Sequence, residues 1–491
     1  MRALPRLGLS CFGLALVLSA AVTATPSDQT INKPQDSSAP YLAMGIKIGE
    51  VTPNSAIIWS RCTAHAERNN DGEPAVGNPG PRTPEYTEEI DANQLEGSVE
   101  GVSGQLRLVW TTYEDWSNAQ HTAWHSVDEA TDFAHQFELP ELSPATKYYV
   151  RVEARAATGA EDRPTRSFAG SFTTAPAPNV WQDIRFGVIT CQMYKDLDHA
   201  DGFHIYPAMA ELHLDFFVPA GDNVYYDNEK PRARTLELAR YHWQRMFSLP
   251  RMVEFFRNHP AYWEKDDHDT RANDAWPSQR ARWMSPFTWE QGLKTFREQV
   301  PMGEKTFRTF RWGQGLQVWL IEGRDFRTPN NMADGPEKTI LGKEQLAWLQ
   351  KSVEESDAAF RVLVSPTPIV GPDRENKNDN HANSGYKFEG DLIRNWAGGL
   401  ENFYICCGDR HWQYMSVDPA TGVREFSCGA ASDQHAGGSP GRDPEYQPFH
   451  RVKGGFLSVA VSREAETPKI VFRFHDVHGE VVYEFADDGR R

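Results

Sequence analysis

The 491-residue sequence predicts two folded domains, an all-β sandwich followed by a layered α/β domain with mixed sheets. From Tyr41 to about Ala177, short alternating or β-branched runs follow one another between turn residues, which is typical of sequential antiparallel strands. Beyond this region apolar strands alternate with helical patterns, which indicates an α/β core. Several of these apolar runs end in Cys, Asp, Tyr or His, so we expect the chemistry at the carboxyl ends of strands.

The first 40 residues are expected to lie outside both domains. Two arginines precede an apolar run from Leu7 to Val22, and the tripeptide ending at Ala24 fits a cleavage site, so residues 1–24 are predicted to be a secretory signal peptide. A membrane anchor is the alternative, although the run is short for a span. Residues 25–40 are predicted to be a flexible lead-in. The mature protein is therefore expected to be exported, periplasmic or secreted, without a stable membrane span.

Residues 41–177 are predicted to form the β-sandwich. Within the segment Leu139 to Val152, Tyr148 follows a proline-containing turn and resembles the tyrosine corner of fibronectin type III and Ig-like domains. Residues 68–99 are predicted to be a long loop, and the proline-rich segment Ala175 to Asn179 a linker to the second domain, residues 178–491. The predicted strands are Ile46–Trp59, Gln105–Tyr113, Phe133–Leu139, Lys147–Ala154 and Arg166–Thr174.

The second domain is predicted to contain helices at Arg232–Met246 and Gly342–Glu355, where apolar positions recur at helical spacing. Three late strands have no helices between them and should form an antiparallel flank of the sheet. They are Gly455–Ser462, Pro468–His475 and Val481–Phe485.

Charge and cysteine content restrict the function classes. A net charge of -17 and a pI near 5.4 argue against a surface for nucleic-acid polymers, which needs clustered Lys and Arg. If Cys11 leaves with the signal peptide, five cysteines remain, so at least one thiol is unpaired within the chain. Cys191 is the candidate for a thiol with another role. A disulfide from Cys406 or Cys407 to Cys428 stays open.

Two apolar runs end in residues that bind metals. Leu214 to Tyr226 contains Asp222, whose carboxylate could bridge two cations after the turn that Gly221 permits, and Tyr225 could reach the same cleft. Cys191 directly follows another run, and a thiolate there would be a strong ligand for iron or zinc. A common turn and a buried apolar cysteine are the alternatives.

Three further segments add polar groups. Asp409 and His411 lie two positions apart after an apolar run, so they face the same way in an extended chain and suit adjacent metals. In Asp266 to Asp269 a carboxylate could bind a hard cation, and His268 could protonate a leaving oxygen. Arg324 and Arg327 follow a third run, and guanidinium groups bind phosphate bidentately. Surface turns, solvated acidic loops and surface ion pairs are the alternatives.

In this order the motifs resemble the alkaline phosphatase D (PhoD-like) family of metallophosphatases, from about Ala43 to the C-terminus. This resemblance implies an exported phosphomonoesterase or phosphodiesterase with an N-terminal β-sandwich before a metallophosphatase domain. A phosphodiesterase of phospholipase D type is a close alternative, and a non-catalytic exported binding protein is the other. The motifs are Thr190-Cys191-Gln192, Gly221 to Tyr225, Asp266 to Asp269, Arg324 to Arg327 and Gly408 to Trp412.

The resemblance also implies a cluster of Fe(III) and Ca²⁺ that acts on a phosphate ester. Matched by motif position, the implied iron ligands are Cys191, Tyr225 and His411, with Asp222 bridging iron to calcium. Asp267 and Asp409 would serve calcium. The implied substrate groups are His268 as proton donor or phosphate contact, Arg324 on phosphate oxygens, Arg327 beside it, and Asn223 as a substrate contact or weaker calcium ligand.

Overall fold

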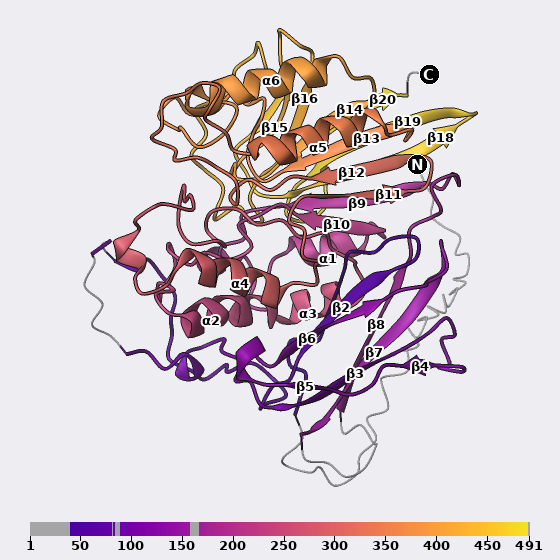
Figure 1. The fold of residues 1–491 in the computed structure, drawn as a ribbon, viewed down its shortest axis with the longest axis vertical. Coiled ribbons are helices and arrows are strands. Elements are labelled where there is room, and N and C mark those ends of the chain that lie inside the picture. Colours follow the sequence, from indigo (N-terminus) through magenta and orange to yellow (C-terminus); the bar gives the residue numbers. More distant parts are fainter. Residues whose placement is uncertain (1–39, 81, 84–88, 158–165, 490–491) are drawn as a thin grey trace, which may run out of the picture. The chain divides into compact units, whose positions relative to one another are not determined.

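The computed structural model describes residues 40–80, 82–83, 89–157 and 166–489 (Figure 1). The described residues all belong to one compact unit. The predicted signal peptide, Cys11 and all but the last residue of the predicted lead-in lie outside the described residues. Within the described part of the chain, no helix has both the length and the apolar character needed to cross a bilayer.

The N-terminal region contains two antiparallel sheets, and inward side chains from both, such as Ile48, Leu106 and Val150, share one buried cluster. The predicted run Ile46–Trp59 forms two strands because a turn at Thr52–Ser55 interrupts it. One sheet contains β1 (Ile46–Gly49), β2 (Ala56–Arg61) and β6 (Ala134–Leu139). The other contains β3 (Gly104–Thr111), β4 (Gln120–His121), β5 (His125–Val127), β7 (Lys147–Ala156) and β8 (Arg166–Thr173).

Tyr148 closes the turn that precedes it, since the backbone N–H of Ser143 donates to its hydroxyl at 2.9 Å. This is the contact expected of a tyrosine corner. The likeness of the whole region to fibronectin type III domains stays a prediction.

The rest of the chain contains two mixed sheets. In the five-stranded sheet, β9 and β10 are parallel, and the late strands pair antiparallel beside β9, as predicted. Its order is β10 (Phe216–Pro219), β9 (Ile184–Ile189), β18 (Phe456–Glu464), β19 (Thr467–His475) and β20 (Val481–Asp488). The seven-stranded sheet has the order β11 (Arg308–Trp312), β12 (Leu316–Leu320), β13 (Phe360–Ser365), β14 (Phe403–Cys407), β16 (Arg424–Cys428), β15 (Gln413–Val417) and β17 (Phe449–Arg451), with β12, β13, β14 and β16 parallel.

The two mixed sheets pack face to face, because Val188, Val318 and Phe472 belong to one buried cluster. Alternate residues of the same strands point outward and pack under helices, so the order of layers is α/β/β/α. Figure 1 shows α5 (Gly342–Glu354) and α6 (Lys387–Gly398) along β12 to β15. The opposite layer contains α1 (Ile205–Ala210), α2 (Leu236–Phe247), α3 (Pro250–Phe256) and α4 (Trp289–Gln299). Short 3₁₀ turns occupy Ala92–Gln94, Glu129–Thr131, Tyr194–Asp196, Arg282–Met284 and Ser384–Tyr386.

The N-terminal region contacts the rest of the chain at several places, and the predicted linker is itself packed. Ala261, in the apolar run before the acidic motif, forms bridges with both Gly49 and Phe217. In the predicted linker, Ala175 is buried and its N–H donates to the carbonyl of Thr52 at 3.3 Å. The linker is thus packed against the strands before it.

The five described cysteines are all free and buried. Cys407 pairs with Ser427 across β14 and β16, and Cys428 lies one position further along. Because these cysteines are free, the disulfide from Cys406 or Cys407 to Cys428 that the sequence left open is not formed.

Candidate metal centre

The strand ends that carry the predicted ligands meet at one place. The N–H of Ala220 donates to Ile189 at 2.8 Å and the N–H of Cys191 to Gly221 at 3.4 Å, which extends the pairing of β9 and β10 past both strands. After β14, Gly408 approaches so closely that a Cβ there would lie 2.4 Å from the carbonyl oxygen of Ala220. Glycine at this position lets three strand ends converge.

Three of the predicted ligands have left-handed backbone conformations. The φ angles are 54° at Cys191, 55° at Asp222 and 61° at Asp409. Such values are uncommon for residues other than glycine and often mark functional sites. Gly221 precedes one of these turns with φ of 88°, and a Cβ there would meet the Cβ of Asp266 at 2.6 Å. The turn therefore brings the acidic motif against Asp222.

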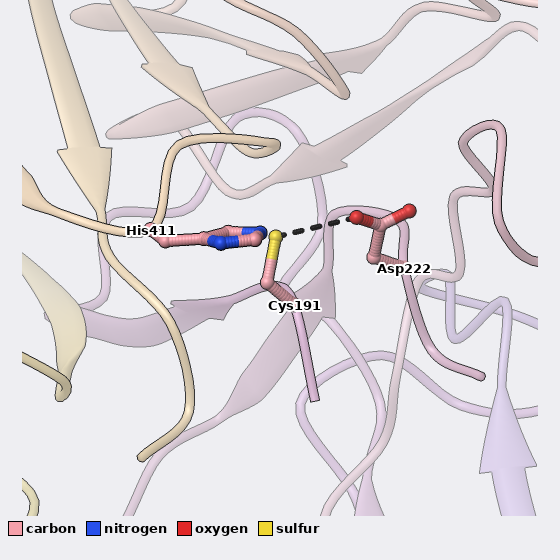
Figure 2. A group of neighbouring side chains, drawn as sticks. All are labelled: Cys191, Asp222 and His411. Carbon is pink, nitrogen blue, oxygen red and sulfur yellow. Dashed lines mark hydrogen bonds between the residues drawn. The ribbon is translucent and has the colours of Figure 1, made fainter. Parts of the chain in front are cut away.

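Cys191, Asp222 and His411 form the first group of ligand atoms (Figure 2). The three side chains point toward one another, and the Sγ of Cys191 lies 3.4 Å from Oδ2 of Asp222. The hydroxyl of Tyr225 donates to the same Oδ2 at 3.0 Å. The structure thus brings together the four residues predicted to bind or bridge iron.

Asp222 also belongs to two other groups, one with Asp267 and His268 and one with Asp266 and Asp409. In each group the ligand atoms lie within 4.8 Å of one another. Asp222 is common to all three, which is the geometry that a bridging carboxylate requires. Its Oδ1 atom and Oδ2 of Asp266 are buried without a hydrogen-bond partner, as expected for oxygens that face cations.

Ionisation of the first group is unfavourable in the metal-free chain. Burial raises the pKa of Asp222 well above its ordinary value; His268 opposes this shift, and the charges of Asp267 and Asp266 add to it. Burial likewise raises the pKa of Cys191 and of Tyr225, with Asp222 adding to both shifts. Buried anions without counter-charges are costly, so this set fits bound cations.

His411 differs from its neighbours because its neutral form is favoured. Burial lowers its pKa well below the ordinary value, and the positive charges of His435 and Arg410 lower it further. A neutral imidazole is the form that binds a metal. Asp267 is stabilised as an anion: burial raises its pKa, but His268 and Arg324 lower it below the ordinary value.

His268 is held by Asp227, a residue that the sequence analysis missed. Nδ1 of His268 lies 2.5 Å from Oδ1 of Asp227, whose side chain is fully buried. Burial alone would lower the pKa of His268, but Asp227, Asp267 and Asp222 raise it well above its ordinary value. The dyad therefore fixes the ring and favours the protonated imidazole. Asp227 lies only five positions after Asp222, two residues past the end of the motif Gly221 to Tyr225.

The predicted substrate residues differ in their surroundings. Nε of Arg324 donates to Asp266 at 2.5 Å, and its Nη2 is buried without a partner, 3.8 Å from Oδ2 of Asp267. The guanidinium of Arg327 instead donates to Gly323, Asn330 and Asp379. The Asn223 amide donates to Glu264 and Asp269. The structure thus brings Arg324 to the centre and gives Arg327 and Asn223 internal partners.

His435 is a second residue that the sequence analysis missed. Its Nε2 lies 3.0 Å from the Tyr225 hydroxyl, its Nδ1 lies 2.8 Å from Oδ2 of Asp196, and its ring centroid lies 4.1 Å from that of His411. The loop that carries it is joined to Cys191, whose carbonyl accepts from the N–H of Ala431 at 3.3 Å. No residue type near His435 in the sequence signals that this histidine lies beside Tyr225 and His411.

A fourth group of neighbouring ligand atoms contains three carboxylates, those of Asp267, Asp274 and Asp379. Lys377 lies within it, with Nζ 2.6 Å from Oδ1 of Asp274 and 3.5 Å from Oδ2 of Asp379. The ammonium neutralises part of the negative charge on this side of the centre.

Comparisons with known proteins agree with this arrangement. A family model for PhoD-like phosphatases matches residues 186–488, and one for the N-terminal domain of PhoD-like phosphatases matches residues 27–176. Alkaline phosphatase D of Bacillus subtilis (strain 168) is 23% identical over 336 residues, which are 57% of this chain and 53% of that protein. The chain thus matches about half the length of this curated relative.

Two solved structures share the fold. The structure of PhoD superposes with a TM-score of 0.70 at 17% identity, over 93% of this chain and 92% of that one. Purple acid phosphatase PPD1 from yellow lupin (Lupinus luteus) seeds superposes with a TM-score of 0.60 at 11% identity, over 91% and 74% of the two chains. At these identities the likeness concerns the fold.

Proposed function

The chain belongs to the PhoD-like phosphatase family, and from this premise we propose that it hydrolyses phosphate esters at a cluster of iron and calcium. The observation that carries the proposal is the position of Asp222 in three groups of ligand atoms at once. One carboxylate shared in this way suits a cluster rather than a single ion.

The donor atoms of the first group agree with iron. Cys191, Tyr225 and His411 offer sulfur, phenol oxygen and imidazole nitrogen, which suit a transition metal better than calcium. Around Asp409 the donors are carboxylates, and around Asp267 they are carboxylates together with His268, so the oxygen donors that suit calcium predominate. The unpartnered oxygens of Asp222 and Asp266 fit cations on both sides. When bound, the cluster would neutralise phosphate charge and lower the pKa of a water to supply hydroxide.

Residues of the chain supply the remaining functions. Arg324 would bind phosphate oxygens through Nη2, which has no hydrogen-bond partner. His268, oriented by Asp227, would donate a proton to the leaving oxygen through Nε2. Arg327 and Asn223, which have internal partners, would position Arg324 and the acidic motif rather than contact the substrate.

Metal analysis and a substrate panel test the proposal together. We expect the purified mature protein to contain one iron with calcium, and to hydrolyse a chromogenic phosphomonoester or diester in calcium but not in chelator. Hydrolysis of phosphatidylcholine with no monoesterase activity would assign the phospholipase D-type alternative. Metal-loaded protein without activity on any ester would support the binding-protein alternative and refute the proposal.

We further propose that the protein is exported by a signal peptide at residues 1–24 and that the chain divides into its two domains near residue 177. Support for the division comes from the boundary between the two family matches, at residues 176 and 186. N-terminal sequencing of the processed protein would decide the first point, and limited proteolysis the second.

A further inference from the structure

Asp274 and Asp379 lie beside the proposed calcium ligand Asp267 at the edge of the metal centre. One carboxylate oxygen from each of the three lies within 4.8 Å of the other two. Asp379 is only 1% exposed, and its Oδ1 atom is buried without a hydrogen-bond partner. A buried carboxylate oxygen without a partner is costly, so this group of three acids requires positive charge.

The positive charge that the chain supplies is an ammonium. Nζ of Lys377 lies 2.6 Å from Oδ1 of Asp274 and 3.5 Å from Oδ2 of Asp379. Among the described residues, no other Lys, Arg or His forms an ion pair with either of these two carboxylates. Burial alone would lower the pKa of Lys377, but Asp379 and Asp274 raise it above the ordinary value. The group therefore favours a charged Lys377.

The two acids are positioned independently of Lys377. Nη2 of Arg327 donates to the backbone carbonyl of Asp379 at 2.7 Å, and Nδ2 of Asn330 donates to the backbone carbonyl of Asp274 at 2.9 Å. Arg327 and Asn330 are themselves joined, since Nη1 of the arginine donates to Oδ1 of the amide at 3.2 Å. The carboxylates are thus held together by the backbone, and a change in the lysine side chain leaves these contacts in place.

The same group has the donor set of a calcium site. Calcium binds carboxylate oxygens at about 2.3 to 2.6 Å, so the contact of Lys377 with Asp274 at 2.6 Å places the ammonium where such an ion would lie. The side chain of Asp274 is 29% exposed, which gives water access to complete the coordination. An ammonium and a divalent cation about 4 Å apart would repel each other, so only one of them occupies the group.

We propose that Lys377 is a built-in cation that occupies a calcium position beside the metal centre, so that the native chain binds one calcium ion fewer than its carboxylates could hold. This inference deepens the proposed function and rests on it, because it takes Asp267 to be a calcium ligand of the centre. The charges of Asp274 and Asp379 are then balanced at any calcium concentration.

Lys377→Met tests this inference, because it removes the ammonium and keeps most of the side-chain volume. The iron-loaded protein is dialysed against about 5 mM calcium, above the Kd of about 0.1 to 1 mM of weak carboxylate sites, and the calcium bound per chain is counted. We expect one more calcium ion per chain in the variant than in the wild type. Lys377→Gln, which is also neutral, should show the same gain. Lys469→Met, which removes a lysine paired with the exposed Glu464 at 3.0 Å, should bind the wild-type number.

A second substitution locates the additional ion. Asp379→Asn should remove it from the Lys377→Met protein but leave the calcium content of the wild type unchanged. Two results would overturn the inference: no additional calcium in either Lys377 variant, or loss of a calcium ion when Asp379→Asn is made in the wild type, since calcium would then already displace Lys377. If the wild type binds no calcium at all, the proposed cluster fails, while the difference between the Lys377 variants and the wild type still decides the role of Lys377.

Discussion

Asp222→Asn should change stability in opposite directions with and without metal. In chelator the wild type contains a buried carboxyl crowded by Asp267 and Asp266, with one oxygen that has no partner. Replacing such a buried ionisable group by a neutral one of the same shape removes this cost. We expect the free energy of unfolding of the metal-free variant to rise by about 1 to 3 kcal/mol.

With iron and calcium present, the same substitution should destabilise the protein. A cluster at a thousandfold excess over its Kd stabilises the native state by about 4 kcal/mol. An amide cannot bridge two cations as a carboxylate does, so most of this gain should be lost. The kcat should fall about a thousandfold, equivalent to about 4 kcal/mol of activation free energy.

Urea denaturation in chelator and in metal, followed on both proteins, measures the two effects. Asp132→Asn is the matched control, since Asp132 is equally buried but pairs with Arg61 at 2.8 Å. That variant should lose about 3 to 5 kcal/mol in both conditions. The reasoning is refuted if Asp222→Asn is destabilised in chelator, or if it keeps its metals and activity within tenfold of the wild type.

Four more variants test the centre and the scaffold. Tyr225→Phe and Cys191→Ala should each remove a visible charge-transfer band from the ferric protein; two zinc ions with full activity in Cys191→Ala would disprove the iron assignment. Asp227→Asn should lower kcat about a hundredfold on an alkyl phosphate but less than tenfold on 4-nitrophenyl phosphate, whose leaving group needs no proton from His268; an equal loss on both would contradict the dyad. Burial raises the pKa of Asp215 to about 6 from 3.8. The native state therefore favours the protonated carboxyl, so the stability present below pH 4 is lost as the pH rises to 6 and the group ionises. Asp215→Asn should therefore be more stable by up to about 3 kcal/mol at pH 8 and unchanged below pH 4, measured by urea denaturation in chelator, and equal stability at pH 8 would count against it.

Local patterns predicted many of the strands and the helices α2 and α5, but not α1, α3, α4 and α6, nor the order of the strands in the sheets. Helices α2 and α5 and the late strands β18 to β20 were predictable because apolar spacing is a local property. The strand β13 carries the same apolar signal and was missed. The order β14-β16-β15 and the pairing of β18 with β9 join residues far apart in the sequence, so no window of sequence contains them.

The same distinction between local signals and long-range contacts applies to the metal centre. The convergence of Cys191, Asp222 and His411 could be predicted because each lies two to four residues beyond a strand end. The contact of His435 with Tyr225 spans 210 residues. This pair depends on how two loops dock, which is decided by tertiary packing rather than by residue spacing.

The backbone at the centre gives an independent reason to expect a ligand. Left-handed conformations at Cys191, Asp222 and Asp409 cost about 1 to 2 kcal/mol each in an L-residue. Unpartnered buried oxygens on Asp222 and Asp266 add about 1 to 3 kcal/mol each. A folded chain retains several such costs in one place only when something offsets them. Cations that bind all these carboxylates at once would do so, and the metal-dependent stability of Asp222→Asn measures that offset directly.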